Sequence, residues 1–323
     1  MALLKTCIFF LLAVSAAAPI SSQPLKAGHY WKKCPSAEKI VRQTVAKAVY
    51  QDPGLGAGLI RMHFHDCFVR GCDGSVLLDA TPGSRSEKDH PANFPSLRGF
   101  EVIDEAKAKL EAQCPKTVSC ADILAFSARD SSYVLGGIDY AVPAGRRDGR
   151  ISSFDDVIPN LPPPTFNATQ LRDTFARKGL SLDEMVTLSG AHSIGVSSCS
   201  SIADRISSDS PNSIDPKHAA YLRKRCPSTA PASSGENPTV FLDVASPNVL
   251  DNKYYMNLVK CKGVLTSDQA LFSSPLTSKL VWRNAQSNKA WAKKYAAAMV
   301  RMGGIQVLTG NQGEIRNNCR FVN

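Results

Sequence analysis

Apolar residues recur every three or four positions along most of the chain, which is the spacing of one face of an α-helix. After Pro35 and Ser36, the positions Ile40, Val41, Val45, Ala48 and Val49 follow this spacing. The segment Lys289 to Met302 repeats it with Trp291, Tyr295, Met299 and Met302 and stops at Gly303 and Gly304. We expect helices in both segments, with these side chains in the core.

Capping residues mark the beginnings of further helices. Ser119 and Asp122 have the spacing of a capping box at the start of the apolar segment Ala121 to Arg129. Ser181 and Glu184 repeat that spacing before Met185 and Leu188. A side chain at each end of such a box accepts a hydrogen bond from a backbone N–H that the helix leaves free, so both segments are predicted to be helical.

The alternation of apolar and polar residues that is typical of strands is nearly absent, which predicts a mostly α protein. One strong break interrupts the helical pattern, the stretch PNLPPP from Pro159 to Pro164. Proline removes a backbone donor and clashes with the preceding turn, so we expect this stretch to be non-helical. It divides the chain into two halves, about residues 23–160 and about 161–323, which are called the distal and the proximal half below. We find no internal repeat.

The N-terminus has the layout of a cleaved secretory signal covering about residues 1–22. Lys5 precedes an apolar run from Cys7 to Val14 and then small residues, so cleavage is expected near Ala18 or just before Gln23. No later apolar stretch reaches the roughly 18 residues of a membrane-spanning helix. A secreted chain without a membrane anchor is therefore expected, with about 300 residues, enough for one large domain or two closely packed ones.

Composition adds two constraints. Ten cysteines less Cys7 of the signal leaves nine, so an oxidising compartment predicts disulfides and one remaining thiol. The net charge of +10 becomes +9 without Lys5. For a secreted chain this favours anionic polysaccharides over nucleic acid as partners, and plain solubility explains the charge equally well.

The stretch RMHFHDCFVRGCDGS, residues 61–75, concentrates the candidate chemistry. On a helix beginning at Asp52 and Pro53, His63 and His65 point to nearly opposite sides, whereas Arg61 and His65 share a face. Zinc is disfavoured, because two thiols five residues apart in a secreted chain are better explained as a disulfide. A neutral histidine beside an arginine can instead move a proton and stabilise negative charge, as cleavage of hydrogen peroxide requires.

Such a pair needs an iron, and the iron needs an axial ligand. Of the six histidines, His192 in TLSGAHSIG is the best candidate, because small residues at positions 190, 191 and 195 would let a flat macrocycle approach. Read alone, this string favours a structural interpretation instead, a helix C-cap with a solvated histidine.

The strings RMHFHDCFVRGCDGSVLL, LSGAHSIG, LDNKYY, SDQALF and NCRFVN together resemble the secretory plant peroxidases, the class III haem peroxidases. The likeness runs from about Leu25 to Asn323, nearly without gaps. It implies the mostly α haem peroxidase fold, with haem b held between the distal and proximal halves. It also implies a secreted, monomeric enzyme that uses hydrogen peroxide to oxidise phenolic donors by one-electron steps, as in lignin or suberin formation.

The resemblance assigns roles to residues of the haem site. His65 would be the distal acid–base catalyst and Arg61 its partner, with Phe64 shielding the distal face and Asn93 binding the other ring nitrogen of His65. His192 would be the axial iron ligand, with Asp268 accepting a hydrogen bond from its ring. Pro162 would line the exposed haem edge where small donors bind.

The resemblance also implies two calcium sites of closely spaced oxygens. The first would comprise Asp66, Val69, Gly71, Asp73, Ser75 and, through water, Glu87. The second would comprise Ser193, which replaces the family's more usual threonine, Asp243, Ser246, Val249 and Asp251. Read without the family, these aspartates are turn and capping residues.

Four disulfides follow from the resemblance: Cys34–Cys114, Cys67–Cys72, Cys120–Cys319 and Cys199–Cys226. Cys261 has no family partner, and we expect a free thiol buried beside the helix KYYMNLVKC. Asn167 in NAT is a glycosylation sequon. The loop between Cys199 and Cys226 lacks the aromatic residues usual in the family, so we expect it to be looser. The absence of the C-terminal extension of vacuolar members favours the apoplast or wall.

A rival function is a non-catalytic protein that uses calcium-ordered loops and a basic surface to bind wall polyanions. The complete set of Arg61, His65 and Asp268 argues against it, because a binding module has no use for these three together.

Overall fold

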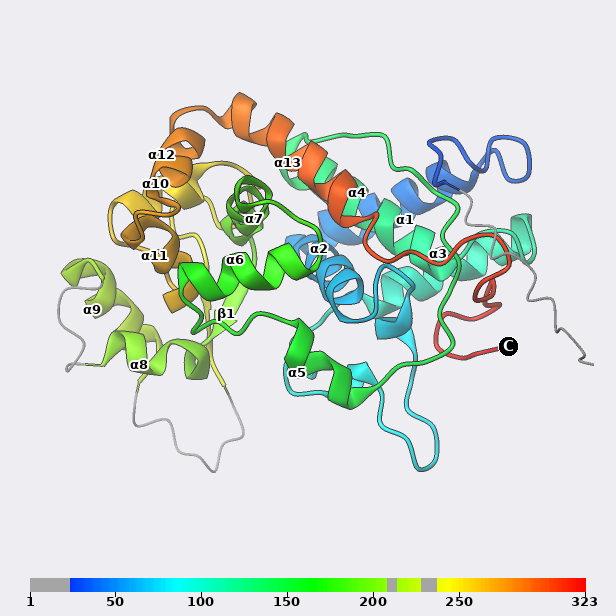
Figure 1. Ribbon diagram of the computed structural model, residues 1–323, viewed down its shortest axis with the longest axis horizontal. Helices are drawn as coiled ribbons and strands as arrows, with labels where there is room; N and C mark the ends of the chain where they lie inside the picture. The colour runs from blue at the N-terminus through cyan, green and yellow to red at the C-terminus, as the bar shows by residue number, and fades with distance from the viewer. Residues whose placement is uncertain (1–23, 208–213, 228–236) are drawn as a thin grey trace, which may run out of the picture.

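A computed structural model describes residues 24–207, 214–227 and 237–323, and within them the chain is mostly helical (Figure 1). The expected secretory signal lies outside the described residues. Within the described part of the chain, no helix is long and apolar enough to cross a membrane.

Helices from the first half of the chain form one group. They are α1 (Ala37–Gln51), α2 (Pro53–Val69), α3 (Phe100–Gln113) and α4 (Cys120–Gly136). Helix α2 packs against both α4 and α1, and α1 packs against α3 and α4. Asp52 is the N-cap of α2, where its side chain accepts a hydrogen bond from the Gly54 N–H, and Pro53 is the first helical residue.

Helices from the second half form the other large group. They are α6 (Ala168–Arg177), α7 (Leu182–Ser189), α10 (Lys253–Val259), α11 (Thr266–Ser273), α12 (Ser278–Gln286) and α13 (Asn288–Met302). The capping box of Ser181 and Glu184 is present at the start of α7. Helix α13 packs against α7, and α10 packs against α12, which places the predicted core residues Trp291, Tyr295, Met299 and Met302 in the buried interior.

Smaller elements connect these groups. Short helices are α5 (Val157–Asn160), α8 (Ala203–Ile206) and α9 (Pro216–Arg225). Single 3₁₀ turns are η1 (Ser75–Leu77), η2 (Glu87–Asp89), η3 (Phe154–Asp156), η4 (Gly190–Ser193) and η5 (Cys199–Ile202). The strands β1 (Val196–Ser198) and β2 (Thr239–Phe241) pair antiparallel with Ser197 opposite Val240. Apolar side chains around α8, α9 and β2 form a small second core.

Two local expectations are wrong. Pro159 lies inside α5, because a proline in the first turn of a helix removes a donor that the helix does not use. Only half of the expected capping box of α4 forms, since the Ser119 hydroxyl accepts from the Asp122 N–H. The Asp122 carboxylate instead accepts hydrogen bonds from the Tyr30 hydroxyl at 2.6 Å and the Arg146 guanidinium at 2.7 Å. Tertiary partners thus replace the local cap.

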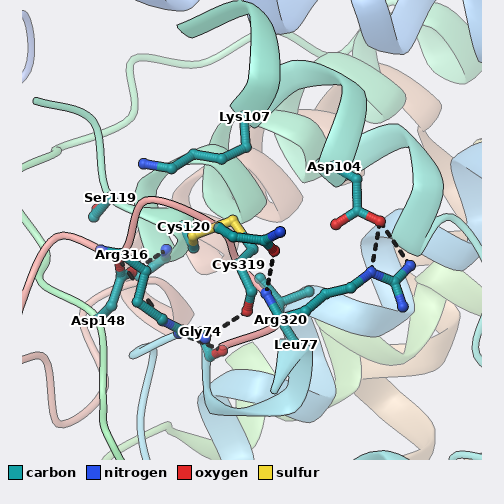
Figure 2. The surroundings of a disulfide bond; sticks show 12 residues. Gly74, Leu77, Asp104, Lys107, Ser119, Cys120, Asp148, Arg316, Cys319 and Arg320 are labelled. Carbon is teal, nitrogen blue, oxygen red and sulfur yellow. Dashed lines mark hydrogen bonds and ion pairs between the residues drawn. A yellow bond between two sulfur atoms is a disulfide. The ribbon is translucent and has the colours of Figure 1, made fainter. Parts of the chain in front are cut away.

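The C-terminal segment is fixed to the first helical group around the disulfide Cys120–Cys319 (Figure 2). The buried Arg316 guanidinium donates to the carbonyls of Cys319 at 2.7 Å and Gly74 at 2.6 Å. Arg320 pairs with Asp104 on α3 at 2.6 Å. The end of the chain therefore supports the loop that follows α2, which carries several predicted site residues.

Candidate active site

One face of α2 differs from the rest of that helix. Ala57, Arg61 and Phe64 are partly exposed, although the residues around them from Gly56 to Val69 are buried. Their spacing of four and three residues places them on one face, and His65 lies four residues after Arg61. This face is therefore the part of α2 that can contact a bound group.

The distal residues form a continuous hydrogen-bonded chain. The Nε of Arg61 donates to Nε2 of His65 at 3.2 Å, and Nδ1 of His65 lies 2.6 Å from Oδ1 of Asn93. The Asn93 amide donates in turn to the backbone carbonyl of Glu87 at 2.7 Å. Because Nε2 accepts from Arg61, the ring proton of His65 belongs on Nδ1, where Asn93 accepts it. His65 therefore presents Nε2 as a base.

The electrostatics agree with this assignment. Burial, together with the nearby charge of Arg61, lowers the pKa of His65 well below its ordinary value, although the Asn93 contact opposes the shift. His65 is therefore neutral at pH 7. Burial and the charge of Arg98 lower the pKa of Arg61 to about 10, so Arg61 keeps its charge. A neutral base thus stands beside a permanent cation.

Arg61 and Phe64 are each held by further contacts. Arg61 donates to the Ala92 carbonyl at 2.9 Å and to the Ser96 hydroxyl at 3.0 Å. The Phe64 ring packs against Phe68, with centroids 4.4 Å apart. These contacts fix the direction of both side chains on the partly exposed face of α2.

On the proximal side, His192 lies in η4, directly after α7. Its Nδ1 is 2.8 Å from Oδ1 of Asp268, a buried residue in the first turn of α11. The Tyr254 hydroxyl donates to the same oxygen at 2.8 Å. Burial alone would lower the pKa of His192, but the charge of Asp268 and the hydrogen bond to it raise the pKa overall.

The chain that follows His192 lies close to the exposed face of α2. The positive charge of Arg61 opposes the rise in the pKa of His192. A Cβ on Gly195 would lie 3.2 Å from the Ala57 side chain, so the chain after His192 reaches the exposed face of α2. The side chain of His192 is 41% exposed although its Nδ1 is held by Asp268. Its other ring nitrogen is therefore available as a metal ligand on this side of α2.

The small residues around His192 serve different structural purposes. A Cβ on Gly190 would lie 2.5 Å from the Tyr255 hydroxyl and 2.8 Å from the Trp291 ring, so this glycine allows close packing of α10 and α13. The expectation that Gly190 admits a macrocycle is therefore wrong. Ala191 is partly buried, and Gly195 has a φ of +87°, a conformation that favours glycine.

Pro162 lies partly exposed in the segment between α5 and α6. Two residues on, the Pro164 carbonyl accepts a hydrogen bond of 2.9 Å from the Ser267 N–H, next to Asp268. The proline segment is therefore fixed beside Asp268, and Pro162 lies two residues before this contact.

The first predicted calcium set surrounds buried carboxylates that form no ion pair within the described part of the chain. Asp66, Asp73 and Glu87 are all buried and repel one another, and burial together with this repulsion raises the pKa of Asp66 well above its ordinary value. Burial is also the main reason that the pKa of Glu87 rises to about 8. Among residues 24–207, 214–227 and 237–323, both Glu87 carboxylate oxygens and the Ser75 hydroxyl are buried without a hydrogen-bond partner. A hard cation would satisfy these oxygens.

The backbone of this loop is shaped by the same aspartates. Asp66 accepts from the Gly74 N–H at 3.0 Å, and Asp73 accepts from the Ser75 N–H at 2.9 Å. The Val69 carbonyl accepts a long contact of 3.4 Å from Lys178, and Gly71 has a φ of +95°. Among the described residues no three His, Cys, Asp or Glu side chains converge on one point, so a cation here would also need carbonyl and hydroxyl oxygens.

The second predicted set is partly preorganised. The Ser193 hydroxyl accepts from the Asp251 N–H at 3.2 Å, and the Ser246 hydroxyl donates to the Asp251 carboxylate at 3.0 Å. One oxygen of Asp243 accepts three hydrogen bonds, whereas the other is buried without a partner. Val249 follows Ser246 in the same turn, where its N–H donates to the Ser246 carbonyl.

All four disulfides that the resemblance implies are present, namely Cys34–Cys114, Cys67–Cys72, Cys120–Cys319 and Cys199–Cys226. Cys261 is free, but it is exposed rather than buried, because it follows the end of α10 with a φ of +55°. Asn167 is exposed as the N-cap of α6, where its Oδ1 accepts from the Gln170 N–H. The loop expected to be loose, between Cys199 and Cys226, lies partly outside the described residues.

Three contacts of the site were not predicted from the sequence. The Glu87 carbonyl supports Asn93, Ser96 supports Arg61, and Tyr254 supports Asp268. Tyr254 belongs to the string LDNKYY, and Ser96 follows HPANF, so both lie in or beside motifs already singled out. Their hydrogen bonds depend on residues far away in the sequence, which a local pattern does not reveal.

The arrangement defines a class of protein: a helical fold in which a neutral distal histidine and an arginine face a second histidine held by a buried carboxylate. Comparison with known proteins identifies the class. Residues 41–287 match the family model described as peroxidase. The chain is 52% identical to "Peroxidase 5" of Vitis vinifera over 304 residues, covering 93% of this chain and 92% of that one. It is 46% identical to "Peroxidase 66" of Arabidopsis thaliana over 329 residues, covering all of both chains.

The protein belongs to the peroxidase family, and it is a class III plant peroxidase that uses hydrogen peroxide to oxidise donor substrates. The family carries haem as its cofactor. The residues described above fit that group, since Gly195, shortly after His192, packs against Ala57 on the partly exposed face of α2, and Asp268 contacts only one ring nitrogen of His192. The non-catalytic rival is therefore not favoured.

Proposed function

We propose that the chain is a secreted peroxidase in which His65 and Arg61 act on hydrogen peroxide while His192 and Asp268 hold the iron of haem b. The observation that carries this proposal is the pair of contacts of the His65 ring. Its Nε2 lies 3.2 Å from the donor Nε of Arg61 and its Nδ1 lies 2.6 Å from the acceptor Oδ1 of Asn93, so we infer that Nε2 is an unprotonated base.

These residues would move one proton and stabilise one developing charge. The haem iron would supply electrons for cleavage of the O–O bond when it is bound. Nε2 of His65 would take the proton from one peroxide oxygen and return it to the other, which leaves as water. Arg61, still charged at neutral pH, would stabilise the negative charge on that leaving oxygen.

The proximal residues would tune the metal. Asp268 accepts the Nδ1 proton of His192 and is itself fixed by Tyr254. A carboxylate in this position makes the imidazole a stronger electron donor to a metal on Nε2. Phe64 would limit access on the distal face, and its contact with Phe68 keeps it in place.

The donors are proposed to be small phenols that bind beside Pro162 and leave as radicals, which couple in lignin-type or suberin-type polymers. The expected signal at residues 1–22 and the disulfides support an extracellular location, in the apoplast or wall. Two calcium ions are proposed at the Asp66 and Asp243 sets, supported by their unpartnered buried oxygens. A monomer, a glycan on Asn167 and binding of anionic wall polysaccharides complete the proposal.

Replacing His65 by Ala tests the assignment of the base. We expect the rate of reaction with peroxide to fall by about 10²- to 10⁴-fold, while haem uptake and the folded state persist. His29→Ala is a matched control, because His29 lies outside the haem site and contacts Tyr30. Unchanged peroxide turnover in His65→Ala would show that another group is the base.

A further inference from the structure

All charged side chains between Asp268 and Glu314 are positive. The 45 residues between them contain six lysines and arginines and no aspartate or glutamate, namely Lys279, Arg283, Lys289, Lys293, Lys294 and Arg301. Lys294 pairs with Asp183, and Arg301 pairs with Glu184. No ion pair or hydrogen bond links the other four side chains to a carboxylate in the described part of the chain. Positive charge is thus left unneutralised along α12 and α13.

A groove lies on this surface between α11 and α12. It is lined by Phe272, Ser278, Lys279, Trp282 and Arg283, and its volume is about 430 Å³. Helix α12 lies at the outer edge of the molecule (Figure 1). The groove is open to solvent, and none of the residues assigned to the haem site lines it, so the peroxide chemistry does not explain it.

Trp282 is the unusual residue of the groove. Its side chain is 52% exposed, whereas Trp291 on the next helix is fully buried. Trp282 and Arg283 lie three and four residues after Lys279, so Lys279 is a neighbour of both on the helix surface, and all three side chains line the groove. An exposed aromatic plane beside two unpaired cations offers two kinds of contact at once, stacking and charge pairing.

We propose that this groove binds a carboxylated polysaccharide, a polyuronate chain, with a sugar ring on Trp282 and carboxylates on Lys279 and Arg283. The apolar C–H face of a pyranose ring matches the exposed indole, and uronate carboxylates match the two unpaired cations. The proposal deepens the wall partner proposed above and rests on it for the class of polymer. Because neither Pro162 nor any haem-site residue lines the groove, we expect an enzyme bound here to keep its donor edge at Pro162 free.

The test is binding of the haem-loaded enzyme to polygalacturonate at low ionic strength. We expect Trp282→Ala and the double variant Lys279→Gln/Arg283→Gln each to raise the Kd about fivefold. The matched control is Lys289→Gln/Lys293→Gln, which removes two unpaired cations at the same spacing on α13, where the intervening Trp291 is buried. This control should change the Kd less than twofold. Fully methyl-esterified galacturonan, with the same rings but no charge, should bind the wild type at least fivefold more weakly.

Equal weakening in both double variants would overturn the proposal, because it would indicate diffuse attraction by net charge. Unchanged binding in Trp282→Ala would overturn it as well. A third outcome would also overturn it. If the wild type bound a neutral lignin-like polymer but not polygalacturonate, and Trp282→Ala lost that binding, the groove would be a donor site instead. Guaiacol turnover separates the two hypotheses, since a wild-type enzyme that oxidises guaiacol but does not bind polygalacturonate contradicts this inference and leaves the peroxidase assignment intact.

Discussion

Asn93 is the residue whose replacement best tests how the distal base is prepared. It is buried, and it joins Nδ1 of His65 at 2.6 Å to the Glu87 carbonyl at 2.7 Å. Asn93→Ala would leave the His65 N–H without a partner, whereas the Glu87 carbonyl would keep its hydrogen bond from the His90 N–H at 3.1 Å. An unsatisfied buried group costs about 1–3 kcal/mol, so we expect the free energy of unfolding to fall by about that amount.

The effect on the reaction follows from the ring proton of His65. Asn93 favours the tautomer that carries the proton on Nδ1 by one hydrogen bond, which contributes about 1 kcal/mol or more. Without Asn93 this preference is lost, and the tautomer that carries the proton on Nε2 becomes more populated. Since about 1.4 kcal/mol corresponds to a factor of ten, we expect the bimolecular rate of reaction with peroxide to fall about tenfold. Stopped-flow absorbance of the haem-loaded enzyme measures this rate, and denaturant melts measure the stability.

Asn284→Ala is the matched control. Asn284 is a buried amide on α12, and its Oδ1 accepts from Lys294 at 3.0 Å. It should also lower stability, but it should leave the peroxide rate within about twofold. An Asn93→Ala enzyme that reacts at the wild-type rate would refute the claim that Asn93 sets the tautomer of His65.

Three further predictions concern stability, calcium and the free thiol. Burial, and to a smaller extent the charge of Arg146, lowers the pKa of His63 to about 3. A histidine of the unfolded chain has a pKa near 6.5, so between these two pH values the unfolded chain binds a proton that the folded chain does not. The free energy of unfolding should therefore fall by up to about 1.4 kcal/mol per pH unit from pH 6.5 toward 3, and urea melts of His63→Gln at a series of pH values should show a smaller fall per pH unit. Removing calcium with a chelator should lower the Tm and slow the peroxide reaction, with recovery on calcium addition; an unchanged Tm would contradict the proposed sites. Because Cys261 is exposed, a thiol reagent should modify one group per native chain, and none in Cys261→Ser.

The pattern of the sequence predicts elements well where one helix face decides their packing. Helix α13 buries the aromatic and sulfur side chains that its spacing selects, and the box of Ser181 and Glu184 opens α7 as expected. The grouping of Arg61 with His65 also follows from helix geometry alone, since residues four apart share a face. These predictions depend on neighbours in the sequence.

Predictions that depend on distant neighbours are less secure. Asp122 has the spacing of a capping residue, yet its carboxylate accepts hydrogen bonds from Tyr30 and Arg146, which lie in other segments. Gly190 makes room for Tyr255 and Trp291, which no local pattern indicates. Cys261 follows an apolar helix but turns outward where the backbone reaches positive φ. In each case tertiary contacts decide what the residue does.

The most direct test is the absorbance spectrum of the purified, haem-loaded and calcium-loaded protein before and after one equivalent of hydrogen peroxide, with His65→Ala in parallel. The account predicts that the haem band of the wild type shifts promptly and returns when guaiacol is added, whereas the variant binds haem but responds far more slowly. A folded wild-type protein that takes up no haem, or whose haem band only bleaches with peroxide, would contradict it.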